Sequence, residues 1–193
     1  MNYDAQMVIQ KELNSGERLI WAGAPKQGLI LKGSDTFTIP FSLLWGGFAI
    51  FWEYMALTMA PKAQNAPDGF ALLFPLFGIP FVVIGLYMIF GRFVYDSKKR
   101  GKTFYGLTNQ RAIIVSGVFR KNVKSLNLKT MSDISLSEKA NGYGSIVFGQ
   151  ENQMMSMFMG GGFPGMGGST TPKFELIENA KQVYKQLIGH QKS

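Results

Sequence analysis

The sequence of 193 residues has no cysteine and a single histidine, His190, near its end. Without cysteine the chain can form no disulfide framework, thiolate zinc site or cysteine nucleophile. Catalytic triads and multi-histidine metal sites need a histidine inside a packed pocket, so a chain with one histidine near its end can hardly form either kind of site. We therefore expect a protein that is not an enzyme and that uses no metal and no cofactor.

Charged residues are scarce as well. They make up 17% of the chain, against the roughly 25% typical of soluble domains. The shortage is concentrated in residues 37–91, where the only charged side chains are Glu53, Lys62 and Asp68. A soluble, disordered or collagen-like chain does not combine such a gap with 46% apolar residues and a net charge of +8.

Two uncharged runs occupy this gap. Thr36–Trp52 continues beyond one glutamate, and Gly69–Gly91 follows after a polar segment rich in turn residues. At about 1.5 Å per helical residue, each run can cross a hydrocarbon core about 30 Å thick. We predict a transmembrane hairpin over residues 37–91, with helices at about 37–59 and 70–91. The alternative is a pair of helices buried in a soluble core, which a domain of this size rarely contains.

Basic residues around the runs predict the orientation of the hairpin, because lysine and arginine are retained on the cytoplasmic side. One lysine lies between the runs, whereas the second run is followed by Arg92, Lys98, Lys99, Arg100 and Lys102. We therefore expect a multi-pass protein of the bacterial inner membrane with both termini in the cytoplasm. The polar, charge-balanced residues 1–36 do not resemble a secretory signal.

Beyond residue 102 the pattern changes to short alternating runs that predict strands. They cover residues 103–108, 111–116, 123–128, 131–138 and 143–149, and Glu17–Gly23 is a further candidate strand. Asn141-Gly142 predicts a tight hairpin turn, because both residues accept positive φ. After Thr171-Pro172, apolar residues recur at helical spacing and predict a closing amphipathic helix.

These patterns divide the chain into five segments. They are an N-terminal cytoplasmic segment (1–36), the transmembrane hairpin (37–91), a sheet (92–149), a loop rich in methionine and glycine (150–171) and a C-terminal helix (172–189). The predicted fold class is a membrane α+β protein, in which an antiparallel β-sheet or barrel is closed by a C-terminal α-helix.

Four stretches of sequence carry a resemblance to a known family. They are Glu17-Arg-Leu-Ile-Trp-Ala-Gly, Tyr105-Gly-Leu-Thr-Asn-Gln-Arg-Ala-Ile-Ile-Val, Val123-Lys-Ser-Leu-Asn-Leu and Gly142-Tyr-Gly-Ser-Ile-Val-Phe-Gly. With the two apolar runs, they resemble bacterial pleckstrin-homology (PH) domain membrane proteins with an inserted two-helix transmembrane hairpin. The resemblance implies a PH-like fold and this topology, and some isolated domains of the family form homo-oligomers. It implies little about activity, and the long insert between Gln150 and Pro172 departs from the pattern.

The segment Arg92–Lys129 holds ten basic residues and one acidic residue, so it carries the net positive charge of the chain. Basic residues after a span fix its topology, and they also attract anionic headgroups, at about 1 kcal/mol each near the surface. The two interpretations are compatible. We expect the five basic residues that follow the second run to contact headgroups, and five more, in the domain itself, could face the bilayer: Arg111, Arg120, Lys121, Lys124 and Lys129. Nucleic acid is not an expected partner, because no aromatic stacking platform accompanies the charges.

Glu53 lies inside the first apolar run. A carboxylate within a span is a candidate intramembrane polar site, used for proton relay or for pairing. Its neighbours Trp52 and Tyr54 favour the opposite interpretation, since such aromatic residues favour headgroup level, where a carboxylate reaches water. Both interpretations stay open at this point.

The loop at 150–171 is a candidate contact surface for the membrane or a partner, because methionine-rich surfaces can repack against different shapes. The residues concerned are Met154, Met155, Met157, Phe158 and Met159. The alternative is a mobile loop that nothing packs. Thioethers also suit Cu(I), but the loop contains no cysteine or histidine to complete such a site.

Together these features favour a membrane-anchored, PH-like interaction module at the cytoplasmic leaflet. We expect it to bind anionic lipid headgroups, protein partners including further copies of itself, or both, without catalysis. The alternative is a small accessory or transport subunit that uses the transmembrane hairpin and Glu53.

Overall fold

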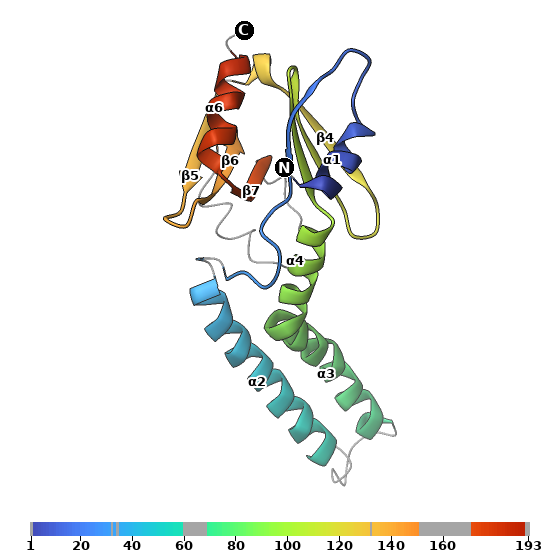
Figure 1. The fold of residues 1–193 in the computed structure, drawn as a ribbon. Helices are drawn as coiled ribbons and strands as arrows, with labels where there is room; N and C mark the ends of the chain where they lie inside the picture. Colours follow the sequence, from blue (N-terminus) through green and yellow to red (C-terminus); the bar gives the residue numbers. More distant parts are fainter. Residues whose placement is uncertain are drawn as a thin grey trace. The chain divides into compact units, whose positions relative to one another are not determined.

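The structure is a computed structural model that describes residues 2–31, 33, 35–59, 69–131, 133–150 and 171–191. These residues divide into two compact units. One unit contains the described residues up to 30 and those from 96 onward, and the other contains the described residues from 31 to 95. The first unit is therefore assembled from segments that are far apart in the sequence, as the colours in Figure 1 show.

The first unit contains two antiparallel β-sheets and a C-terminal helix. The strand orders are β1-β2-β3-β4 and β5-β6-β7. The elements are β1 (Leu19–Gly23), β2 (Phe104–Thr108), β3 (Arg111–Ser116), β4 (Asn122–Asn127), the 3-10 turn η3 (Leu128–Thr130), β5 (Ile134–Glu138), β6 (Tyr143–Phe148), β7 (Lys173–Glu178) and the helix α6 (Ala180–Gln191). The predicted antiparallel sheet with a closing C-terminal helix is confirmed at this level, and it is built as two sheets.

Strand β1 pairs with β2 although 80 residues separate them in the sequence. Trp21 lies opposite Leu107, and Gly23 lies opposite Tyr105. The candidate strand at Glu17–Gly23 is thus confirmed as the edge of the first sheet. Everything between Gly23 and β2, including the helices of the second unit, is an insertion between two adjacent strands.

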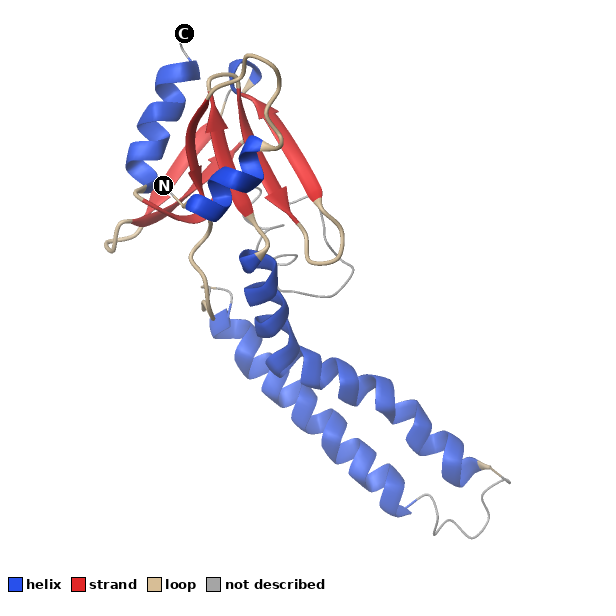
Figure 2. Cartoon of the chain, turned by 45° about the vertical axis from the view of Figure 1, so that its right-hand side comes forward, coloured by secondary structure: helices blue, strands red, loops and turns tan. Residues whose placement is uncertain are grey.

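Strands β2 and β3 are buried on both faces, because successive side chains of a strand point in opposite directions. Ile113 and Val115 of β3 pack with Ile9 on one face, whereas Ala112 and Ile114 belong to the larger core on the other. Ile9 belongs to α1 (Tyr3–Gln10), a short helix that the sequence did not indicate and that lies across the sheet in Figure 2. By contrast, five of the six residues of β4 are exposed, as expected for an edge strand.

Phe174 of β7 lies at the centre of the larger core. Its ring centroid is 4.8 Å from that of Tyr105 and 4.9 Å from that of Phe148, so it joins the two sheets. The helix α6 contributes Val183 and Leu187 to the same cluster. Burial also raises the pKa of the Tyr105 hydroxyl, which accepts a hydrogen bond from the Glu175 amide at 3.2 Å.

The predicted C-terminal helix is wrong in its first part. Residues Lys173–Glu178 form β7, paired with β6, and the helix begins only at Ala180. Phe174 and Ile177 are three residues apart, a spacing typical of helices. Both are nevertheless buried side chains of strand β7, because the pairing register between β7 and β6 shifts between Gly144 and Ile146. Asn179, at φ 52°, then separates the strand from α6.

The second unit is a pair of packed helices, α2 (Asp35–Met59) and α3 (Phe70–Leu86). Beyond α3 the chain continues without interruption through a π-helical turn, η2 (Tyr87–Gly91), into α4 (Arg92–Gly101). Side chains on the inner face of α2 are small: Ser42, Gly46, Ala49 and Ala56. A Cβ atom on Gly85 would lie 2.9 Å from the Gly46 Cα, so the two backbones approach too closely for any larger residue there.

Among the described residues, one helix is long and apolar enough to cross a membrane. It runs from Pro75 to Gly101, and 22% of its most apolar 18-residue window is buried. The helix α2 is 25 residues long but is not a second candidate by length and composition. The predicted polar turn between the two helices lies outside the described residues, apart from its last residue, Gly69.

Candidate functional site

The predicted headgroup-binding residues lie on α4 and just after it, on a helix that continues directly from the apolar one. Lys98, Lys99 and Lys102 are exposed. In the part of the chain that the structure describes, no acidic side chain pairs with their ammonium groups. These three residues are called the lysine collar below. Their charges are open to solvent and available to an anionic surface.

Arg100 has a different environment, because it is only 5% exposed. Its Nη2 donates to the Gly28 carbonyl at 2.7 Å, and its Nη1 is 3.7 Å from the Asp96 carboxylate. The Gln27 amide in turn donates to the Arg100 carbonyl at 3.3 Å. Arg100 therefore fixes the segment that follows β1 rather than facing outward.

Arg92 is likewise buried, within the second unit. Its Nη1 lies 2.9 Å from Asp35 Oδ1, and both side chains are about nine-tenths buried. The ion pair joins the first residue of α2 to the first residue of α4. Removing Asp35 would leave the Arg92 guanidinium buried without this carboxylate, so the pair holds this end of the two helices together.

The most specific part of the sequence resemblance, Tyr105 to Arg111, forms a hydrogen-bonded network with the N-terminal segment. Arg111 makes two hydrogen bonds to the Glu17 carboxylate: its Nε donates to Oε1 at 2.8 Å, and its Nη2 donates to Oε2 at 2.9 Å. The Thr108 hydroxyl donates to Glu17 at 2.8 Å, and the Asn109 side chain accepts from the Arg18 amide at 3.0 Å. Because the arginine is so close, the pKa of Glu17 falls from 4.5 to about 2. These residues fasten β1 to the β2–β3 hairpin.

Because its guanidinium group is bound to Glu17 in this network, Arg111 is not among the basic residues that could face a bilayer. Lys121 pairs with Glu12. Arg120, Lys124 and Lys129 are exposed, and they remain available to an anionic surface. The sequence predicted headgroup contact for the five basic residues after the second run and a possible bilayer-facing position for five more, whereas the structure separates exposed basic residues from those that hold the fold.

Glu53 faces α3 across Gly78. A Cβ atom on Gly78 would lie 1.8 Å from Glu53 Oε2, so the carboxylate occupies the space that a side chain there would need. This Oε2 atom is buried and has no hydrogen-bond partner among the described residues. The neighbours Trp52 and Tyr54 are exposed. Glu53 therefore lies between the two helices, and its functional role stays a prediction.

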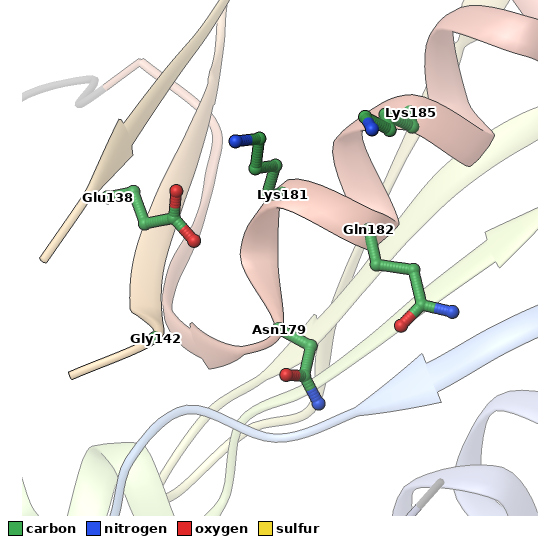
Figure 3. Close-up of a pocket in the computed structure, with 6 residues that line it drawn as sticks. All are labelled: Glu138, Gly142, Asn179, Lys181, Gln182 and Lys185. Carbon is green, nitrogen blue, oxygen red and sulfur yellow. The ribbon is translucent and has the colours of Figure 1, made fainter. Parts of the chain in front are cut away.

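Described residues of the first unit line shallow cavities, among them two of similar volume. The first, of about 300 Å³, is lined by Glu138, Gly142, Asn179, Lys181, Gln182 and Lys185, with Lys181 extending on the side of Glu138 (Figure 3). The second, of about 310 Å³, lies between β1 and α6 and includes Trp21. Within the described residues, no group of three or more side chains is arranged to hold a metal ion. The predicted contact loop, with Met154, Met155, Met157, Phe158 and Met159, lies outside the described residues.

The family described as "Bacterial PH domain" matches residues 56–190 of the chain. The match covers more than half of the sequence and includes β2 to α6, and the chain therefore belongs to this bacterial family. No curated protein and no solved structure matches it. Together with the two antiparallel sheets and the C-terminal helix, family membership indicates an interaction module for lipid or protein.

Proposed function

We propose that the chain is a PH-like interaction module that two transmembrane helices hold at the cytoplasmic leaflet of the bacterial inner membrane. It binds anionic headgroups through the lysine collar, and its free surfaces bind protein partners, including other copies of itself. The module carries out no catalysis, requires no cofactor or metal and binds no nucleic acid.

The observation that carries the proposal is the arrangement of side chains in the second unit. Small residues face the partner helix, and large apolar residues face outward, among them Phe37 at 76% exposure and Leu44 at 74%. Of 28 exposed large apolar side chains in the described residues, 22 lie between Phe37 and Tyr95. In water this surface would be strongly unfavourable, whereas lipid chains would cover it without penalty.

The lysine collar supports the headgroup part of the proposal by its position. Lys98 and Lys99 lie in the last turn of the apolar helix and Lys102 directly follows it, where basic residues meet the negative surface potential of the cytoplasmic leaflet. At about 1 kcal/mol per residue, three lysines contribute up to about 3 kcal/mol at low salt. Surface charges are screened by salt, so this contribution must fall as ionic strength rises.

The headgroup test uses the full chain in nanodiscs and spin-labelled phosphatidylglycerol or phosphatidylcholine. We expect the native chain to retain phosphatidylglycerol selectively at low salt and the variant K98Q/K99Q/K102Q to lose most of this selectivity. The matched control is K139Q/K181Q/K185Q, which removes the same charge from three exposed lysines elsewhere on the domain. Equal lipid selectivity in the native chain and both variants would refute headgroup binding by the collar.

The hairpin is tested by single-cysteine labelling, which suits a chain without native cysteine. A membrane-impermeant maleimide added to intact spheroplasts should label a cysteine at Asn65, in the predicted turn. It should not label one at Gln110, in the domain, until the membrane is opened. Labelling of both positions, or of neither, before the membrane is opened contradicts the proposed topology.

A second candidate function rests on Glu53. Its unpartnered, buried Oε2 atom between the two helices is the kind of group that marks an intramembrane polar site. In this case the chain is a small accessory or transport subunit. The variant E53Q should then fail to rescue a growth or transport phenotype of the deletion strain, while membrane residence and headgroup selectivity stay native. A fully functional E53Q variant eliminates this candidate.

A further inference from the structure

The turn between β3 and β4 presents the most exposed large apolar side chain of the described residues. Phe119 is 91% exposed. The turn depends on Gly117, at φ +137°, because a Cβ atom there would lie 1.8 Å from the Arg120 carbonyl oxygen. Gly117 thus supplies a backbone conformation that other residues rarely adopt, and the turn built on it leaves the Phe119 side chain in solvent.

Exposed basic residues follow Phe119 in the sequence. Arg120 and Lys124 are exposed, whereas the charge of Lys121 is compensated by its pairing with Glu12. Between Arg111 and Thr130 the sequence contains no acidic residue. An exposed aromatic ring followed by exposed basic residues matches a membrane interface with anionic headgroups, where rings lie at headgroup level and cations bind phosphates.

Sheet topology places this turn at the end of the sheet where the chain arrives from α4. Phe104, the first residue of β2, lies opposite Val115 near the end of β3. Only Lys102 and Thr103 separate Phe104 from Gly101, the last residue of the apolar helix. At roughly 3.5 Å per residue, the turn and the end of that helix are within roughly 25 Å of each other along this path.

The length of the helix brings its end close to the bilayer surface. From Phe70 to Gly101 the continuous helix has 32 residues and spans about 48 Å at 1.5 Å per residue, a few Å more than a bilayer including its headgroups, which is about 40–45 Å thick. A helix that crosses the membrane therefore ends just above the headgroup layer, and the turn, within roughly 25 Å of that end, is near enough to reach the layer.

We infer that the β3–β4 turn is a second membrane contact, in which Phe119 inserts into the interfacial layer and Arg120 and Lys124 bind lipid phosphates. The inference rests on the proposed function, since it requires the apolar helix to span the membrane. It adds an apolar contact to the electrostatic one of the lysine collar. With two separate contacts the domain is held in one orientation on the leaflet, instead of pivoting about the end of α4.

The test measures the depth of a fluorescent label beside Phe119 in the full chain. A cysteine at Asn122 carries an NBD group, and the nanodiscs contain phosphatidylglycerol and a lipid with a shallow doxyl quencher. A second label site, Gln110, is at the opposite end of β3, about 20 Å away at 3.3 Å per residue. We expect strong quenching at residue 122 and none at residue 110.

Substitutions at Phe119 separate insertion from proximity. F119S should abolish quenching at residue 122, and F119L, which keeps an apolar side chain, should retain most of it. The matched control is Y3S, which removes another exposed aromatic residue of the same unit, 72% exposed, and should leave quenching unchanged. The variant chains are compared by circular dichroism, so that a loss of quenching in a folded F119S chain reports insertion.

Three results would overturn the inference. One is an unquenched label at residue 122 in the native chain, and another is equal quenching in the native chain and in F119S. The third is a label shielded from water but insensitive to doxyl lipid, which would assign the turn to a second copy or another protein. Lipid selectivity of the collar variant K98Q/K99Q/K102Q is measured separately, so failure of Phe119 insertion is distinguishable from failure of headgroup binding by the collar.

Discussion

The ion pair between Glu17 and Arg111 predicts a specific stability defect. Glu17 has no exposed side-chain surface, and it accepts from Arg111, from the Thr108 hydroxyl and from the Asn14 amide. The variant E17Q keeps the size of the side chain but removes its charge. It leaves Arg111 without its carboxylate partner, so the contacts that fasten β1 to the β2–β3 hairpin weaken.

The magnitude follows from the pKa of Glu17, which falls from 4.5 to about 2 in the folded protein. At about 1.4 kcal/mol per unit, this difference corresponds to about 3 kcal/mol of folding free energy. Because the folded pKa is lowered, the unfolded chain binds more protons between pH 4.5 and 2. The contribution is complete above about pH 4.5 and is lost as the pH falls toward 2.

The assay is urea unfolding of the full chain in detergent micelles, followed by Trp21 fluorescence after Trp45 and Trp52 are replaced by phenylalanine. At pH 7 we expect E17Q to be less stable than the parent by about 3 kcal/mol. The matched control is E12Q, whose carboxylate pairs with the half-exposed Lys121 and should contribute less than about 1 kcal/mol. Equal losses in the two variants at pH 7, or an E17Q defect that persists unchanged at pH 2.5, would refute the reasoning.

Three further predictions concern packing in the two units. G85V should separate α2 from α3 and lower the thermal unfolding temperature in micelles, because the valine side chain would clash with the Gly46 backbone. The control G47A should be tolerated, because a Cβ atom at residue 47 has no neighbour within 4 Å. Similar unfolding temperatures for the two variants would contradict the close contact between the helices. D35N should destabilise the paired helices by about 3–5 kcal/mol, because it leaves Arg92 buried without its counter-ion, and the double variant D35N/R92M should recover much of this loss in the same unfolding assay. F174A should cost about 3–5 kcal/mol in urea unfolding, because it opens a cavity between Tyr105 and Phe148; a loss below about 1 kcal/mol would show that Phe174 does not join the sheets.

Alternating patterns were sufficient to predict most of the sheet. The strands from β2 to β6 coincide with the predicted runs to within a few residues, and Gly142, at φ 78°, adopts the turn conformation that Asn141-Gly142 indicated. These elements follow from local chemistry, namely period-two burial and positive φ. The segment that forms β7 was misassigned because the spacing from Phe174 to Ile177 fits a helix as well as a bulged strand.

Other features depend on contacts that no local pattern contains. The helix α1 has only eight residues, too few for a clear apolar period, and it is stabilised by packing Ile9 against β3. The basic segment illustrates the same limit within the candidate site. Arg92, Lys98, Lys99 and Arg100 are alike in sequence, but only tertiary structure brings Asp35 to Arg92 and the Gly28 carbonyl to Arg100.

The insertion between β1 and β2 has a consequence for biosynthesis. Strand β1 leaves the ribosome 80 residues before its neighbour, which takes about 4–16 s at 5–20 residues per second. During this interval β2, the strand that pairs with β1, has not yet been synthesised, and neither has Arg111, which lies 94 positions after Glu17. The first sheet therefore closes only after both helices of the second unit have been made.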